Sequence, residues 1–218
     1  MNIEQQKEIA YEILQRLSVV CKEVCIAGGA PRNWYLDRPA RDVDFYLFTK
    51  SKLDVDSFHS LMSSVGFDDL VPVGGGSSET YAGEKGINAV LETVVDELPV
   101  QFIAVEWSFD KIVDTFTVSI SKLYLSLLSS GRINNVYTPE FLESVKTKTI
   151  TAREPKTNGE FEYINKIYNY FPDWNWVHTY DPEEVKQKLI QEKKKEYVPL
   201  VWPTIVDFMT TEPVTIQL

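Results

Sequence analysis

The spacing of apolar residues along the chain predicts several amphipathic helices. Residues 4–17 repeat apolar side chains every three to four positions, which is the period of one helical face. Asp54 or Asp56 can cap a second helix that ends near Gly66. The same criteria predict further helices over residues 31–36, 139–145, 161–170 and 183–195.

Shorter apolar runs, rich in β-branched and aromatic residues, predict strands over residues 24–27, 43–48, 87–95, 100–106 and 174–180. Residues 118–128 are apolar enough to be buried, but their periodicity does not separate helix from strand. A glycine-rich stretch over residues 74–78 predicts a hairpin-like connection, and the last twenty residues, punctuated by proline, are expected to be extended.

The order of these elements predicts the fold class. Strands and helices alternate over the first 110 residues, and helices dominate afterwards. This order favours an α+β fold with a mixed sheet, followed by a small helical C-terminal portion. We expect one domain over residues 1–150 and a mostly helical extension over residues 151–218.

Composition narrows the classes of function. The 218 residues include 22 basic and 32 acidic side chains, for a net charge of −10. This charge disfavours a tight, sequence-independent nucleic-acid binder, because phosphate neutralisation dominates the affinity of such proteins. No apolar stretch approaches the length of a membrane span, and the N-terminus lacks the pattern of a signal peptide. We therefore expect a cytoplasmic protein without a membrane partner, and the oligomeric state stays open.

Cysteine and histidine are scarce. Cys21 and Cys25 are the two cysteines, and His59 and His178 are the two histidines. This set does not complete a structural zinc site, so we expect two buried, reduced thiols. The scarcity of histidine also disfavours a Ser-His-Asp or Cys-His mechanism.

The segment from Gly28 to Asp44 has the strongest chemical pattern in the chain. Gly28 and Gly29 lie between a predicted strand and a predicted helix, where the backbone can approach a phosphate closely. Asp42 and Asp44 alternate at the start of a strand, so both carboxylates project from one face and suit Mg²⁺. The nearby cations that could pair with triphosphate oxygens are Arg32, Arg38 and Arg41.

Each of these features has an ordinary structural explanation when it is taken alone. A Gly-Gly pair is usually a turn, an Asp-x-Asp pair is usually a solvated strand edge, and mixed Arg and Asp residues form surface salt bridges. The combination, at fixed spacing in a strand–turn–helix–loop–strand context, favours a binding site.

This segment resembles, without gaps, the signature of the class II CCA-adding enzymes and bacterial poly(A) polymerases, which belong to the DNA polymerase β nucleotidyltransferase superfamily. The positions that agree are Gly28, Gly29, Arg32, Leu36, Arg38, Asp42 and Asp44. Residues 115–124 and 138–150 are similar, in the same order, to two later family segments. The resemblance implies that Gly28, Gly29 and Arg32 hold a nucleoside triphosphate and that Asp42 and Asp44 bind catalytic Mg²⁺.

Several positions depart from the family pattern. Asn33 stands in place of an acid, and Thr115 and Ser119 replace residues that help to hold the nucleotide and select the ribose. Gln101 lies at the expected place of a further acid, with Glu97 and Glu106 as poorly placed substitutes, and where the family has paired arginines the chain offers Lys166.

Three hypotheses follow from the sequence. The first is a Mg²⁺-dependent nucleotidyltransferase that moves a nucleoside monophosphate to a hydroxyl of an RNA 3′ end or another acceptor. The second is a catalytically degenerate fold that acts as a nucleotide-binding or protein-interaction module. The third, an unrelated α+β protein, is the weakest because three segments agree with the family in order.

Overall fold

The structure is a computed structural model that describes residues 1–49, 51–73 and 86–196, with side chains described through residue 190. The predicted glycine-rich connection at residues 74–78 and the predicted extended stretch at the C-terminus lie outside this part.

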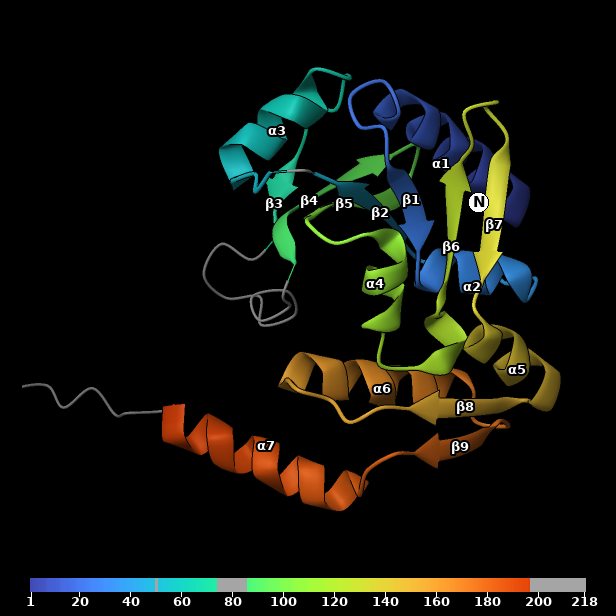
Figure 1. Ribbon diagram of the computed structural model, residues 1–218, viewed down its shortest axis with the longest axis vertical. Helices are drawn as coiled ribbons and strands as arrows, with labels where there is room; N and C mark the ends of the chain where they lie inside the picture. Colours follow the sequence, from blue (N-terminus) through green and yellow to red (C-terminus); the bar gives the residue numbers. More distant parts are fainter. Residues whose placement is uncertain (50, 74–85, 197–218) are drawn as a thin grey trace, which may run out of the picture.

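Within the described residues, seven strands form the main sheet in the order β3-β4-β5-β2-β1-β6-β7 (Figure 1). Strands β2 and β5 run parallel, and every other neighbouring pair is antiparallel. Their bounds are β1 Val24–Ala27, β2 Val43–Phe48, β3 Val71–Pro72, β4 Ile87–Val95, β5 Leu98–Val105, β6 Leu123–Leu127 and β7 Ile133–Tyr137. The predicted α+β class with a mixed sheet is confirmed.

A parallel pair of strands, β8 Thr149–Ala152 and β9 Asn175–His178, lies apart from the main sheet. The helices of the described chain are α1 Ile3–Leu17, α2 Gly29–Tyr35, α3 Val55–Ser63, α4 Phe109–Asp114, the 3₁₀ helix η1 Ser119–Ser121, α5 Pro139–Thr147, α6 Asn158–Tyr170 and α7 Pro182–Glu196.

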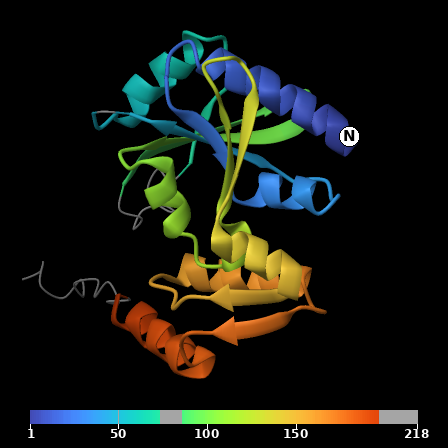
Figure 2. The ribbon, with the colours of Figure 1, turned by 45° about the vertical axis from the view of Figure 1, so that its right-hand side comes forward.

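The two faces of the main sheet are covered by different helices (Figure 2). Because side chains alternate along a strand, Phe45 and Leu47 of β2 face the core formed with α1 and α3. Tyr46 points the other way, into a smaller cluster with Ile112 and Val113 of α4. Asp44 shares this second face, so the fold directs it toward the side of α4 and α6.

A second core joins α5, α6, η1 and the β8–β9 pair below the main sheet (Figure 1). Its buried side chains include Val118, Phe141, Ile150, Ile164 and Phe171. The domain boundary expected at residue 150 stays a prediction, and in the structure that position lies inside β8. Among the described residues, no helix combines the length and apolarity needed to cross a membrane.

The elements agree with the sequence patterns except where those patterns are weak. Residues 118–128 separate into η1 and β6, and α2 begins at Gly29, two residues before the predicted start. The sequence patterns do not predict helix α4 or strands β3, β7 and β8. Both cysteines are buried and free, as expected.

Candidate active site

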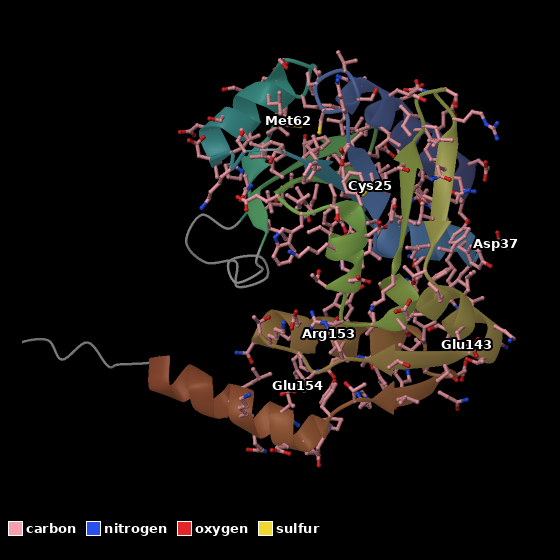
Figure 3. The ribbon with its side chains drawn as sticks, in the orientation of Figure 1. Cys25, Asp37, Met62, Glu143, Arg153 and Glu154 are labelled. Atoms are coloured by element: carbon pink, nitrogen blue, oxygen red, sulfur yellow. The ribbon has the colours of Figure 1, made fainter. Side chains whose placement is uncertain are left out.

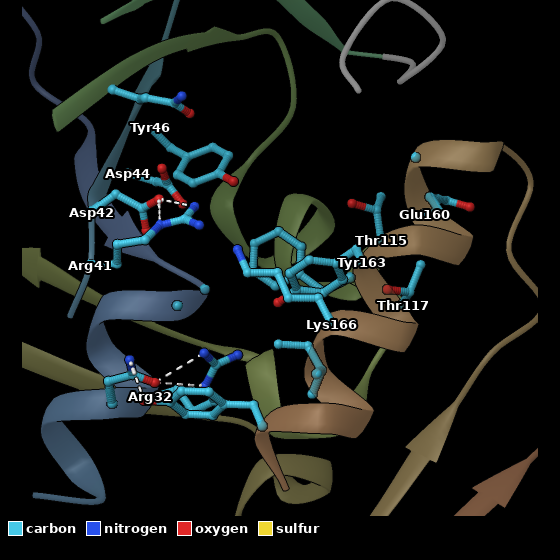
Figure 4. A pocket seen from close by; sticks show the side chains of 18 of the residues that line it. Arg32, Arg41, Asp42, Asp44, Tyr46, Thr115, Thr117, Glu160, Tyr163 and Lys166 are labelled. Carbon is cyan, nitrogen blue, oxygen red and sulfur yellow. Dashed lines mark hydrogen bonds and ion pairs between the residues drawn. The ribbon is translucent and has the colours of Figure 1, made fainter. Parts of the chain in front are cut away.

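A cavity of about 450 Å³ opens between β2, α2 and α6 (Figure 4). Its sheet side includes Gln101 of β5, and its helix side includes Tyr163 and Lys166 of α6. Among the residues predicted from the sequence, those that line it are Gly28, Gly29, Arg32, Arg41, Asp42 and Asp44. Arg38 is not among the lining residues.

Asp42, the residue immediately before β2, and Asp44, within β2, both line the cavity. Asp44 is partly buried, and this burial, together with the charge of Asp42, raises the pKa of Asp44 to about 7. Asp42 is more open, with 34% of its side chain exposed. Its Oδ2 accepts hydrogen bonds from Arg41 at 2.6 Å from Nη2 and 3.0 Å from Nε. Two carboxylates therefore converge in the cavity, one ion-paired and one poorly solvated.

The turn between β1 and α2 requires glycine at its first position. Gly28 has φ +77° and ψ −116°, a backbone conformation that L side chains rarely adopt. Gly29 begins the helix with an ordinary backbone, and a Cβ added there would meet Arg32 at 3.9 Å, an ordinary contact. The turn brings the chain from the buried strand β1 directly to the cavity.

Arg32 is buried and held from two sides. Its Nε and Nη2 both donate to Oδ1 of Asn33 at 3.0 Å, and Nη1 donates to Oγ of Ser121 at 3.0 Å. Ser121 in turn shares a hydrogen bond of 2.8 Å with the hydroxyl of Tyr163 on α6. Because Asn33 is neutral, it orients the guanidinium and leaves its positive charge uncancelled.

Arg38 has a different position from the one predicted. Its guanidinium lies over the rings of Tyr170 and Phe171, 5.2 Å from each centroid, and its Nη1 donates to the carbonyl of Tyr170 at 3.5 Å. This cation–π contact attaches the loop after α2 to the end of α6. In the structure Arg38 joins two elements beside the cavity.

The helix side of the cavity contains residues that the sequence patterns did not indicate. Glu160, Tyr163 and Thr117 line it, and the hydroxyl of Thr117 is buried with no hydrogen-bond partner among the residues that the structure describes. Glu160 forms an ion pair with Arg153, 2.7 Å from Nη2, and Arg153 also donates to the carbonyl of Thr115. Arg153 lies where the end of α4 approaches α6 (Figure 3). Arg153 links Glu160 of α6 to the carbonyl of Thr115, and Thr115 and Glu160 are far apart in the sequence.

The register of the sheet places Gln101 directly beside Asp44 on the neighbouring parallel strand. Its Nε2 donates to Glu92 of β4 at 3.4 Å. Neither Glu97 nor Glu106 lines the cavity. Across the described residues, no group of three or more His, Cys, Asp or Glu side chains is arranged to hold a metal ion. The sheet side of the cavity therefore presents two carboxylates, Asp42 and Asp44, with an amide beside Asp44.

The fold of this chain is similar to that of several solved structures. No protein-family model and no curated protein matches the chain. Solved structures do match: a tRNA-processing enzyme in its apo form has a TM-score of 0.55 at 16% identity, over 88% of this chain and 48% of that one. A CCA-adding enzyme with ATP has a TM-score of 0.56 at 13% identity, over 88% and 43%.

A third match is the Thermotoga maritima CCA-adding enzyme in complex with tRNA, with a TM-score of 0.55 at 13% identity, over 86% of this chain and 42% of that one. At these identities the likeness shows the fold alone, which this chain shares with part of each of these enzymes. The chain spans less than half the length of each of these three solved chains.

Proposed function

We propose that this chain, which has a nucleotidyltransferase-type fold, is a Mg²⁺-dependent nucleotidyltransferase. It would move a nucleoside monophosphate from a nucleoside triphosphate to an acceptor hydroxyl and release pyrophosphate. The observation that carries this proposal is the pair Asp42 and Asp44, which lie two residues apart at the start of β2 and line a cavity that also holds Arg32 and Lys166. Paired carboxylates beside cations suit phosphoryl transfer.

The residues present fit a magnesium ion. Mg²⁺ in such sites binds one or two carboxylates together with substrate phosphates and water, so two aspartates suffice as protein ligands. Asp44 supports the fit, because a carboxylate with its pKa raised to about 7 by burial gains most from a nearby cation. Held by Asp42 and Asp44, Mg²⁺ would supply charge neutralisation at the phosphates and activation of the acceptor hydroxyl.

The protein groups contribute mainly position and charge. Arg32, fixed by Asn33 and Ser121, directs an uncancelled positive charge at one side of the cavity. The left-handed backbone at Gly28 keeps the turn close to the space that a triphosphate would fill. Because the transition state of phosphoryl transfer is stabilised mostly by alignment and electrostatics, this arrangement needs no nucleophilic side chain.

The acceptor belongs to the same proposal. An RNA 3′ end is favoured by the similar solved structures, whose descriptions are of tRNA processing and of a tRNA complex. The net charge of −10 opposes general attraction to a polyanion. We therefore propose that the acceptor is a hydroxyl group, which an RNA 3′ end could supply. Its recognition would not depend on the net charge of the protein.

A second candidate is a nucleotide-binding or protein-interaction module that does not transfer. Gln101 beside Asp44 favours it, because an amide in place of a carboxylate lowers the negative charge available to a metal. In that case the cavity would bind a nucleoside triphosphate and leave it intact.

A pyrophosphate-release assay separates the two candidates. Purified protein receives each ribonucleoside triphosphate with Mg²⁺ and a pool of small RNAs, beside Asp42→Ala, Asp44→Ala and the exposed control Asp68→Ala. Release that needs both aspartates and survives Asp68→Ala supports the transferase. Nucleotide binding without release under every acceptor condition supports the module.

A further inference from the structure

Most cations beside the cavity are already held by neighbours. Arg32 donates to Asn33 and Ser121, Arg41 is ion-paired with Asp42, and Arg38 lies on the ring of Tyr170. Lys166 differs: within the described part of the chain it has no hydrogen bond, ion pair or cation–π contact.

The position of Lys166 follows from the geometry of α6. Residues 159, 160, 163, 166, 167 and 170 recur at helical spacing and all line the cavity. The ammonium of Lys166 points into the cavity toward the side that holds Arg41, Asp42 and Asp44 (Figure 4). Desolvation, followed by the charge of Arg41, lowers the pKa of Lys166, while the charge of Asp42 opposes this effect.

The other polar groups on the α6 side are engaged. The carboxylate of Glu160 accepts from Arg153 and from the backbone N–H of Lys156, and the hydroxyl of Tyr163 is paired with Ser121. An ammonium offers donors alone, so it cannot by itself pair with a base edge that presents both donors and acceptors. The α6 side therefore presents a point charge suited to an anion.

We propose that Lys166 binds the phosphate chain of the nucleotide, as a ligand from α6 that faces the aspartate pair across the cavity. This inference rests on the proposed function for its substrate. Lysine carries a compact cation on a flexible side chain, so its ammonium can donate to phosphate oxygens without a fixed geometry. The chemical class recognised is an inorganic or nucleoside polyphosphate.

Inorganic triphosphate tests this subsite without a base or ribose. Calorimetric titration in the presence of EDTA compares the wild type with Lys166→Met, Lys166→Arg and the exposed control Lys146→Met, whose side chain is 79% exposed on α5. We expect Lys166→Met to weaken binding about tenfold, because one charge-assisted hydrogen bond is lost. Lys166→Arg should stay within about threefold of the wild type, and Lys146→Met should not change the affinity.

The four ribonucleoside triphosphates provide the second readout. Lys166→Met should weaken the binding of all four nucleotides by the same factor as the binding of inorganic triphosphate, since the contact does not involve the base. A loss confined to particular bases, with unchanged binding of inorganic triphosphate, would overturn the assignment and make Lys166 a base contact. Unchanged binding of every probe, or a wild type that binds none of them, would overturn it as well.

Failure of the proposed function has a separate signature. If the wild type binds inorganic triphosphate through Lys166 but releases no pyrophosphate, the role of Lys166 in phosphate binding is supported and the transferase activity is refuted. Lys166→Gln provides a second variant, should the methionine variant melt at a lower temperature than the wild type.

Discussion

The cavity has one side made by β2 with the turn before α2, and another made by α6, and the two sides hold their charges differently. On the sheet side Asp42 pairs with Arg41 and Arg32 is fixed by Asn33, while Asp44 is partly buried and has a raised pKa. On the α6 side Glu160 is turned to Arg153, and Lys166 has no partner among the described residues.

This contrast suggests a division of labour. A group that must stay aligned during phosphoryl transfer benefits from neighbours that fix its rotamer. A group that follows a substrate benefits from a free, flexible stem. The sheet side also follows the family signature closely, whereas the α6 side departs from it. Under the proposed function, the chemistry would reside on the sheet side, and Lys166 on the helix side would bind the substrate.

The largest expected effect comes from the aspartates. Asp42→Asn and Asp44→Asn keep the shape of each side chain and remove its charge, so we expect at least about a thousandfold loss of pyrophosphate release. Nucleotide binding measured with EDTA should weaken little, because Lys166 and Arg32 remain. Release rates with Mg²⁺, beside binding without metal, provide the measurement.

The opposite result would contradict the assignment of chemistry to the sheet side and of substrate binding to the α6 side. If Asp42→Asn kept normal release while Lys166→Met abolished it, the chemistry would lie on α6. The control Asp68→Asn, in an exposed loop, should match the wild type in both assays.

The turn before α2 gives the next largest effect, this time on stability. Gly28→Ala places a Cβ at φ +77° and ψ −116°, and we expect a loss of about 2 kcal/mol in the free energy of unfolding. Gly29→Ala changes an ordinary helical position and should stay within about 0.5 kcal/mol. Urea denaturation of both variants measures the difference, and equal values would show that the turn carries no backbone constraint.

Sequence reasoning located the sheet side because its signals are short-range. Gly28 needs a left-handed backbone, and Asp42 and Asp44 share a strand face, so their neighbours in sequence are enough to place them. The α6 side depends on contacts far apart in the chain. Thr117 and Glu160, more than forty positions apart in the sequence, both line the cavity, and no local pattern encodes that proximity.

The missed strands have a related cause. Strand β7, Ile133–Tyr137, carries two asparagines and has weak strand propensity by itself. It forms because a tight turn at Gly131, with φ +77°, returns the chain against β6. Strand β8 pairs with β9, more than twenty residues later, so its signal is tertiary.

Asp44 provides a prediction on pH dependence. Its pKa is about 7 in the folded protein and has its ordinary value of 3.8 in the unfolded chain. Folding therefore keeps a proton that the unfolded chain loses, and the stability of the wild type falls as pH rises from about 4 to 7. Asp44→Asn should remove this fall and be about 2 kcal/mol more stable than the wild type at pH 8, with little difference at pH 4.

Urea denaturation at pH 4, 6 and 8 measures this difference. Equal slopes with pH for the wild type and Asp44→Asn would mean that Asp44 is solvated in the folded protein. Under the proposed function the gain in stability should accompany the loss of pyrophosphate release, because the carboxylate whose burial costs stability would also be the one that binds the metal.

The smallest effect concerns the ion pair that closes the α6 side. Arg153 and Glu160 have 30% and 11% of their side chains exposed, so screening by solvent limits their coupling to about 1 kcal/mol. A double-mutant cycle with Arg153→Met and Glu160→Gln, measured by urea denaturation, gives that coupling directly. Glu160→Gln should also leave the affinity for inorganic triphosphate unchanged, because Arg153 already turns the carboxylate away from Lys166. A marked rise in triphosphate affinity would instead show that Glu160 repels the phosphate chain, and the α6 side would then be tuned by two opposed charges.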